Sequence, residues 1–529
     1  MSARPGRVAV LEQLAADGFT HMFGNPGTVE QGFLDAVPDS GIEYVLALQE
    51  TVAVAMADGY ARAAQRPALV QLHSGVGLGN GIGMLYQARR GGTPLVVLVG
   101  EAGVRYDAMD GQMAADLVGM AEPVTKAALR ALSPCSVLRV LRRAIKVAQT
   151  PPTGPVVVIL PADVLDRLTD EPVVPTSVPV TRVAPEPGLI ADAARLLQAG
   201  RRPLILMGDG VAAAGAQPEL TAIAEKLGAP VWGVNSSEVN FDTTHPWYGG
   251  QFGHMFGADS AAVVGTADAV LVVGTYLFPE VYPALASPFR PDARIVHVDA
   301  DPDQIAKNFP VDIGVCADPK RTLAALAGRL TGAGRPAPVP AGAAPADDSV
   351  WARFVRTLAE RLPDDVIVFD EALTAGGPVA RYLPPTTPGR FFQTRGGSLG
   401  VGIPGAMGVK LARPDAPVVG FTGDGGSMYT VQALWTAARM GIDATFVICN
   451  NHRYRLLDAN IERYWQDVGE PPHEHPAFFD LSGPDIDFAA LAESLGVPGR
   501  RVVKHDDVDP VVDELVRHHG PFLIDVAVD

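Results

Sequence analysis

Two short polar runs in this 529-residue chain combine metal-ligating residue types with a spacing that could bring them together. Gly423-Asp424-Gly425 follows an apolar run at residues 417–421, and Asn450-Asn451 closes a second one at residues 444–449. One carboxylate, one amide oxygen and a nearby backbone carbonyl suit a hard divalent cation such as Mg²⁺, whose octahedron phosphate oxygens and water would complete. Glycine lets the backbone approach a phosphate where a helix begins and free N–H groups point outward.

These runs need a strand–turn–helix–strand unit to position them. Both apolar runs have the length of strands, and residues 427–440 between them have helical length and composition without proline. A right-handed crossover makes such strands parallel neighbours. Asp424 and Asn451 are therefore predicted at the carboxyl ends of adjacent strands, the edge where open α/β sheets bind ligands.

The placing of these two runs resembles the motif of the thiamine-diphosphate-dependent enzymes. Further matching segments extend the resemblance over essentially the whole chain; they are residues 23–28, 46–50, 57–61, 72–74, 396–400 and 433–438. The chain is identified as a member of the group that comprises 2-oxoacid decarboxylases and acetohydroxyacid synthases. Within that group it most resembles the benzoylformate decarboxylases.

The resemblance implies thiamine diphosphate and Mg²⁺ as cofactors. Glu50 matches the glutamate that activates the pyrimidine ring, although a glutamate also suits the first turn of any helix. Gly397 matches the residue whose carbonyl receives the cofactor's amino group. Leu399 matches the apolar wedge that bends the cofactor, and ordinary core packing is its alternative role.

Further residues are assigned to the diphosphate and the metal by the same resemblance. Asp424, Asn451 and the backbone carbonyl of Arg453 would ligate Mg²⁺. Gly426 stands where the family has a serine, so backbone amides would replace that hydroxyl. The predicted diphosphate-side residues are Thr374, Gly423, Asp424, Gly425, Gly426, Ser427, Asn451, Arg453 and Tyr454.

Two residues match positions that act on the substrate in the family. His73 matches a proton-transfer histidine, although a lone histidine after a strand often only makes a local hydrogen bond. Thr28 matches a serine that contacts the substrate carboxylate. The second catalytic histidine of the benzoylformate decarboxylases has no counterpart in residues 274–283; Glu280, Tyr282 or His254 are the candidates to replace it.

The expected reaction is non-oxidative decarboxylation of a 2-oxoacid, with C–C cleavage through a cofactor-bound carbanion. A carboligating transferase resembling acetolactate synthase is the alternative. A non-catalytic paralogue is less favoured, because it would have no chemical need to retain Glu50, His73, Asp424 and Asn451. If Arg455 faces the cleft, we hypothesise a substrate with a second anionic group.

The resemblance also implies a homodimer or homotetramer, because in this family the cofactor lies between subunits. Glu50 of one chain would then face Asp424 of another. In relatives resembling acetohydroxyacid synthase the middle domain holds FAD, and no sequence feature here requires it.

Composition limits the partners and the compartment. The formal net charge of −17 argues against nucleic acid and anionic membranes as partners. No uninterrupted apolar run of membrane-spanning length appears, and the first residues do not read as a signal sequence. Three cysteines without a Cys-x-x-Cys pair indicate a reducing compartment. We therefore expect a cytoplasmic protein that acts on small molecules.

Strand-like and helix-like runs alternate throughout, which predicts an α/β protein of three doubly wound domains with parallel sheets. The expected domains are a pyrimidine-binding domain at residues 1–170, a Rossmann-like middle domain at 189–330, and a diphosphate- and Mg²⁺-binding domain at 348–529. The family's fold implies one topology for the first and third domains. Proline-rich stretches at 171–188 and 331–347 are expected to be extended linkers.

Overall fold

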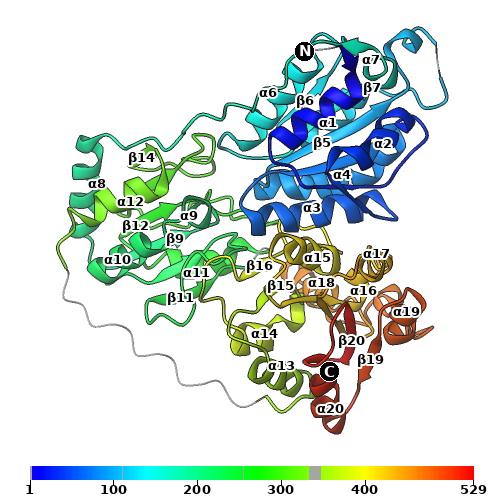
Figure 1. Ribbon diagram of the computed structural model, residues 1–529. Helices are drawn as coiled ribbons and strands as arrows, with labels where there is room; N and C mark the ends of the chain where they lie inside the picture. The colour runs from blue at the N-terminus through cyan, green and yellow to red at the C-terminus, as the bar shows by residue number, and fades with distance from the viewer. Residues whose placement is uncertain (1–2, 110, 254, 333–346, 529) are drawn as a thin grey trace. The chain divides into compact units, whose positions relative to one another are not determined.

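The computed structural model describes residues 3–109, 111–253, 255–332 and 347–528. The chain forms two compact units. The first unit comprises Met1–Pro179, Asp347–Leu383 and Thr394–Asp529, and the second comprises Val180–Ala346 and Pro384–Gln393. Both alternate helices and strands along the chain, as Figure 1 shows by label and colour. Most of the expected linker at 331–347 lies outside the described residues.

The amino-terminal sheet of the first unit has the strand order β3-β2-β4-β5-β7-β6, and all its pairings are parallel. Its strands are β2 (His21–Gly24), β3 (Glu43–Leu46), β4 (Ala68–His73), β5 (Leu95–Glu101), β6 (Ala127–Arg130) and β7 (Val156–Pro161). The main helices between them are α1 (Gly6–Ala16), α2 (Gln31–Ala36), α3 (Glu50–Ala64), α4 (Ser74–Gly91), α5 (Leu117–Ala121), α6 (Val137–Gln149) and α7 (Ala162–Leu165). The central strands are continuous apolar runs because helices cover both of their faces.

The carboxy-terminal sheet repeats this topology, as the family resemblance implied. Its strands in this unit are β15 (Ile367–Glu371), β17 (Val418–Gly423), β18 (Thr445–Asn450), β19 (Gly499–Val502) and β20 (Phe522–Ala527). Their order, β15-β17-β18-β20-β19, is that of β2-β4-β5-β7-β6. The accompanying helices are α13 (Val350–Arg361), α14 (Gly376–Tyr382), α15 (Gly402–Ala412), α18 (Arg455–Val468), α19 (Phe488–Ser494) and α20 (His505–Leu515).

The crossover between β17 and β18 differs from the single helix predicted at residues 427–440. It contains a short helix, α16 (Asp424–Ser427), then turns, then α17 (Ala433–Met440). The hydroxyl of buried Thr430 donates to the carbonyl of Gly400 at 2.7 Å. This tertiary bond holds the intervening turns against a neighbouring loop, a contact that helical composition does not encode.

Helices α3 and α15 cross at very short range in the first unit. A Cβ added to Gly408 would lie 1.9 Å from the carbonyl oxygen of Met56, and one added to Gly59 would lie 2.2 Å from that of Gly405. Both distances are shorter than any normal van der Waals contact. The two helices can therefore approach this closely only because glycine occupies both positions.

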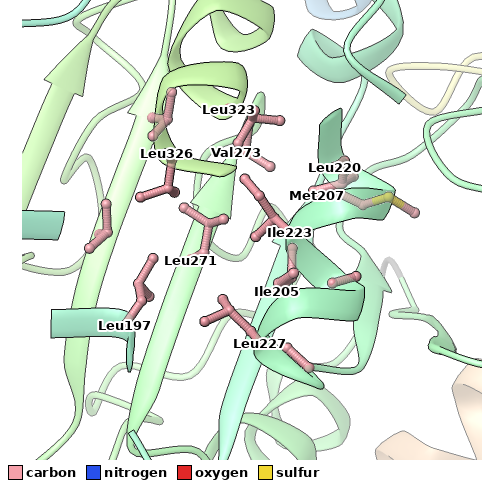
Figure 2. Packing of buried hydrophobic residues seen from close by; sticks show 14 of the residues in the cluster. Leu197, Ile205, Met207, Leu220, Ile223, Leu227, Leu271, Val273, Leu323 and Leu326 are labelled. Atoms are coloured by element: carbon pink, nitrogen blue, oxygen red, sulfur yellow. The ribbon is translucent and has the colours of Figure 1, made fainter. Parts of the chain in front are cut away.

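The second unit has the strand order β11-β10-β9-β12-β13-β14, again with parallel pairings. Its elements are α8 (Pro187–Ala199), β9 (Pro203–Met207), α9 (Gly210–Ala214), α10 (Gln217–Leu227), β10 (Val231–Gly233), β11 (Tyr248–Gln251), α11 (Gly257–Val264), β12 (Ala269–Val273), β13 (Arg294–Asp299), β14 (Ile313–Cys316), α12 (Pro319–Ala327) and β16 (Phe391–Gln393). Figure 2 shows its core, where Ile205 and Leu271 of the sheet pack against Ile223 of α10 and Leu323 of α12.

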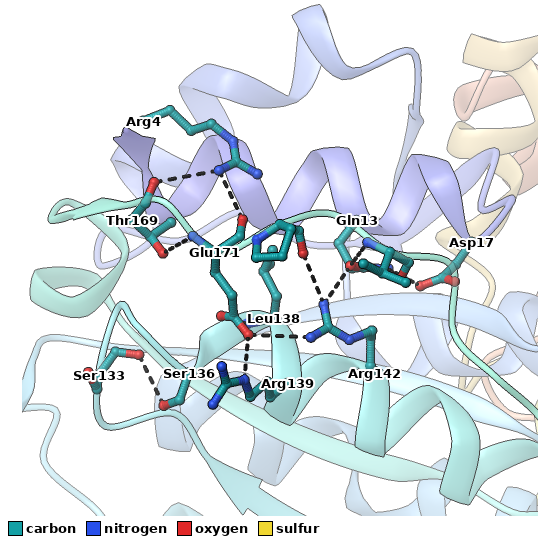
Figure 3. A network of polar contacts seen from close by, with 12 residues as sticks. Arg4, Gln13, Asp17, Ser133, Ser136, Leu138, Arg139, Arg142, Thr169 and Glu171 are labelled. Carbon is teal, nitrogen blue, oxygen red and sulfur yellow. Dashed lines mark hydrogen bonds and ion pairs between the residues drawn. The ribbon is translucent and has the colours of Figure 1, made fainter. Parts of the chain in front are cut away.

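The proline-rich stretch at 171–188 has no helix or strand before α8 begins, as expected of a linker. Its first part is nevertheless packed rather than free (Figure 3). Glu171 is buried and accepts the backbone N–H of Leu138 at 3.0 Å. The N–H of Thr176 donates to Asp17 at 2.6 Å. Side-chain acceptors thus satisfy a backbone that proline keeps out of regular structure.

None of the helices among the described residues is long and apolar enough to cross a bilayer.

Candidate active site

The structure brings the predicted metal ligands together at the edge of the carboxy-terminal sheet. Strands β17 and β18 are parallel neighbours, so Asp424 and the residues after β18 emerge side by side, as predicted. The backbone N–H of Arg453 donates both to Asp424 Oδ2 at 3.1 Å and to Asn451 Oδ1 at 3.0 Å. Asp424 Oδ1 accepts the N–H of Gly425 at 2.8 Å. Two hard oxygens therefore converge on one point.

Burial raises the pKa of Asp424, and backbone N–H groups of Gly425 and Arg453 partly oppose that rise. A divalent cation would favour the ionised form of such a carboxylate. The side chain of Arg453 does not compete for the site, because it pairs with Asp458 at 3.0 Å through Nη2. The side-chain oxygens of Asp424 and Asn451 are thus of the kind that Mg²⁺ prefers as ligands.

The segment after β17 lies close against Tyr454. A Cβ on Gly425 would lie 2.4 Å from the Tyr454 ring, so this position requires glycine. Gly423 has open space at the corresponding point. Ser427 is buried, and its hydroxyl donates to the backbone carbonyl of Asp424 at 2.7 Å. The hydroxyl proton is therefore used inside the turn and is not donated to a phosphate. Thr374 is exposed, just past the carboxyl end of neighbouring β15.

A buried glutamate that the sequence analysis missed holds the loop containing Gly397 and Leu399. Glu371 accepts the N–H groups of Gly400 at 2.6 Å and Gly402 at 2.7 Å, and the hydroxyl of Thr422 at 2.9 Å. Burial raises the pKa of this carboxyl to about 7. Its only sequence signal was an acidic residue ending an apolar strand.

Gly397 has φ +82° and nothing within 4 Å of an added Cβ, so its backbone is open to a ligand. Leu399 is half-buried beside it. The next residue back, Ser398, donates to the carbonyl of Gly83 on α4 at 3.1 Å. One turn earlier on α4, Asn80 donates to Glu50 Oε2 at 2.9 Å. The same helix therefore contacts both the Gly397 loop and Glu50.

Glu50 is 5% exposed at the first position of α3. Its other oxygen, Oε1, accepts from Asn25 Nδ2 at 3.3 Å. Two side-chain amides therefore donate to this carboxyl, one to each oxygen, and hold it in place at the start of α3.

His73 lies next to Glu50 across a glycine. A Cβ on Gly77 would lie 3.0 Å from Glu50 Oε1 and 3.2 Å from His73 Cβ, and one on Gly27 would lie 2.0 Å from the His73 ring. Gly27 is needed for this packing and Gly77 leaves little room for a side chain, so that Glu50, His73 and the turn before Thr28 come together. Thr28 itself is exposed.

The second residue that the sequence analysis missed is Glu30. His73 Nδ1 lies 3.0 and 3.2 Å from the two oxygens of Glu30, whose side chain is buried. Burial raises the pKa of Glu30, and His73 opposes the rise. A carboxylate on Nδ1 orients the ring and leaves Nε2 for proton transfer. No local pattern marked Glu30 for this role, because a glutamate just before a helix is usually interpreted as a capping residue.

The candidates for the absent second histidine lie in the second unit. Glu280 is buried and bonded to the hydroxyl of Ser260. Tyr282 is 62% exposed and stacks on Phe256 at 5.7 Å. His254 lies outside the described residues. Arg455, in the first unit, is exposed at the start of α18.

Three family models of thiamine pyrophosphate enzymes match consecutive parts of the chain. The amino-terminal TPP-binding domain matches residues 5–120, the central domain 190–326 and the carboxy-terminal TPP-binding domain 375–526. A benzoylformate decarboxylase from Pseudomonas aeruginosa is 31% identical, with 98% of both chains covered. An acetolactate synthase large subunit from Haemophilus influenzae is 27% identical, covering all of this chain and 95% of that one.

Solved structures agree with these matches. The thiamine diphosphate-dependent 4-hydroxybenzoylformate decarboxylase of Rhodococcus jostii RHA1 has a TM-score of 0.89 to this chain. The two are 30% identical, and the likeness covers 99% of each chain.

Proposed function

Because this chain belongs to the thiamine pyrophosphate enzymes, we propose that it catalyses the Mg²⁺-dependent, non-oxidative decarboxylation of a 2-oxoacid. When bound, thiamine diphosphate supplies the nucleophilic carbon and the electron sink for breaking the bond to the carboxylate. Asp424, Asn451 and the Arg453 carbonyl would hold the Mg²⁺ and diphosphate end. Glu50 and Gly397 would hold the pyrimidine end.

The pairing of His73 with Glu30 is the observation that favours a decarboxylase. When carbon dioxide is lost, the substrate carbon that carried it must take up a proton before an aldehyde can leave. In carboligation the same carbon bonds to an acceptor carbonyl instead. Glu30 lies 3.0 Å from Nδ1 of His73, which orients the ring and leaves Nε2 to deliver that proton. His73 lies beside Glu50, at the pyrimidine end of the proposed cofactor site.

A carboligating transferase is the second candidate. Residues 274–283 contain no histidine, so a second proton donor of the benzoylformate decarboxylase type is missing there. The relatives at similar identity include acetolactate synthases. A single proton-transfer group would slow aldehyde release and lengthen the time in which an acceptor could react.

The test is a mass-spectrometric screen of 2-oxoacids with cofactor and Mg²⁺, each run with and without an aldehyde acceptor. Free aldehyde in both conditions supports the decarboxylase. Hydroxyketone as the main product supports the ligase instead. The screen includes His73→Asn and, as matched control, exposed His519→Asn. We expect about a hundredfold slower aldehyde release in the first variant only, the usual scale for losing a general acid. Equal rates in both variants would remove His73 from the mechanism.

We also propose that each site takes Glu50 and Asp424 from different chains. Glu50→Gln and Asp424→Asn are each expected to be inactive. If the two variants are unfolded, mixed and reassembled, half of random dimers are hybrids with one intact site, so about a quarter of wild-type activity returns. No recovery in a mixture that size-exclusion chromatography shows to be assembled contradicts sites between subunits.

A further inference from the structure

The two residues that flank Asn451 are both tied to one buried carboxylate, Asp525. On the first flank, Asn450 closes β18 and is 2% exposed, and its Nδ2 donates to Asp525 Oδ1 at 3.0 Å. Asp525 is fully buried in β20, the parallel neighbour of β18. The backbone N–H of Val528 also donates to the carbonyl of Asn450 at 2.8 Å. The end of β18 is thus fixed to the last strand of the sheet directly before Asn451.

The second flank, His452, is connected to the same carboxylate through Arg501 and Asp485. Nε of Arg501 lies 3.4 Å from Oδ2 of Asp525, and its Nη1 donates to Oδ2 of Asp485 at 3.0 Å. The other oxygen of Asp485, Oδ1, lies 3.2 Å from Nδ1 of His452. A guanidinium presents its donors in a rigid fork, so it can bind two carboxylates and fix their relative positions. We call these residues, with Asn450, the Arg501 network.

The backbone of His452 explains why this flank needs support. Its φ is +55°, in the left-handed region that disfavours residues with a Cβ. Directly after this turn, the N–H of Arg453 donates to the side-chain oxygens of Asp424 and Asn451. The carbonyl of His452 itself accepts the N–H of Leu481 at 2.7 Å. The conformation of His452 therefore sets where two of the proposed ligands, Asn451 and the Arg453 carbonyl, stand relative to each other.

We propose that the Arg501 network makes the metal site selective for Mg²⁺ over Ca²⁺, with Arg501 as the positioning residue. Mg²⁺ demands a near-ideal octahedron at short distances, whereas Ca²⁺ accepts more oxygens at longer distances and in flexible geometry. A ligand loop that is held at both flanks cannot move outward to suit Ca²⁺. The inference rests on the proposed Mg²⁺ and cofactor site, and it goes further because none of the network's side chains is a predicted metal ligand.

The experiment is calorimetric titration of the full-length protein, freed of metal with a chelator, with thiamine diphosphate at increasing Mg²⁺ or Ca²⁺. Arg501→Gln should raise the Mg²⁺ concentration for half-maximal binding about tenfold, the usual scale for losing a group that orients metal ligands. The Ca²⁺ requirement should rise at most about twofold, because Ca²⁺ tolerates a displaced ligand. Arg500→Gln is the matched control and should change neither, because Arg500 is the adjacent residue of β19 and pairs with Glu514 at 2.6 Å instead.

A second variant separates positioning from stability, because Arg501→Gln leaves the buried Asp525 carboxylate without its cation. Asp485→Asn acts on the exposed part of the network and keeps Arg501 beside Asp525. It should lower the preference for Mg²⁺ over Ca²⁺ in the same direction. Thermal unfolding without metal identifies a variant that does not fold, and if Arg501→Gln fails to fold, the result for Asp485→Asn decides.

The ratio of the two metal requirements is the readout, because general destabilisation would shift both metals alike. Equal shifts for Mg²⁺ and Ca²⁺, or no shift in either network variant, would overturn the inference and leave the proposed function intact. Absence of metal-dependent cofactor binding in wild type would overturn the proposed function and the inference with it. No turnover is measured, so the choice between decarboxylase and ligase does not affect the outcome.

Discussion

Replacing Gly408 by alanine tests whether the crossing of α3 and α15 sets the geometry of the active site. The added Cβ would lie 1.9 Å from the carbonyl oxygen of Met56, where about 3 Å is the shortest distance that real Cβ atoms show. The helices must therefore separate by about 1 Å. Helix α3 begins at Glu50, and α15 begins directly after the loop that contains Gly397. Separation would thus move both predicted cofactor contacts.

Two opposing effects determine how much Gly408→Ala changes the free energy of unfolding. Alanine in a helix is favoured over glycine by about 1 kcal/mol, and overpacking a tight interface costs typically 1–3 kcal/mol or more. Because the clash is with a backbone atom, the upper end of that cost applies. We expect a net loss of about 2 kcal/mol, or a midpoint of thermal unfolding lower by a few degrees. A displacement of about 1 Å can also lower a catalytic rate about a hundredfold.

The assay combines scanning calorimetry with single-turnover kinetics, and Gly83→Ala on α4 is the control. Gly83 has open space at its Cβ, so alanine there should raise the unfolding midpoint slightly. The reasoning is refuted if Gly408→Ala unfolds at or above the wild-type temperature. It is also refuted if both alanine variants shift the midpoint by the same amount.

Three further outcomes are expected. Glu371→Gln should weaken cofactor binding about tenfold, because the new NH₂ group would face one of the two backbone N–H groups that now donate to the carboxylate. Fluorescence titration measures this affinity, and an unchanged value would show that Glu371 does not hold the loop. Asp424→Asn should need at least tenfold more Mg²⁺ for half-maximal cofactor binding, since it removes the charged ligand; wild-type Mg²⁺ dependence would disprove that role. Burial raises the pKa of Asp299 to about 6, so the folded state keeps a proton that the unfolded state releases between about pH 4 and 6. Wild type should therefore lose up to about 3 kcal/mol relative to Asp299→Asn as pH rises through that window, and a difference in unfolding midpoint that does not vary with pH would contradict the assignment.

Much of the fold could be predicted because parallel strands that are buried on both faces have continuous apolar sequences. The strands β9 and β12 have the bounds of the apolar runs Pro203–Met207 and Ala269–Val273. The adjacency of Asp424 and Asn451 was also predicted correctly, because a short right-handed crossover most often joins neighbouring parallel strands. The prediction of a single helix at residues 427–440 was wrong. The turns between α16 and α17 are held by the hydrogen bond from Thr430 to Gly400, which joins residues far apart in the chain.

The sequence by itself determined the α/β class, the family and the closeness of Asp424 to Asn451, because these depend on local runs and on spacing along one crossover. Only the tertiary structure decided which groups support them. Glu30 meets His73, and Glu371 meets the N–H groups of Gly400 and Gly402, across long separations in sequence. No local pattern marks such partners. The groups that donate to a buried carboxylate come from segments far away in the sequence, and its neighbours in the chain do not reveal them.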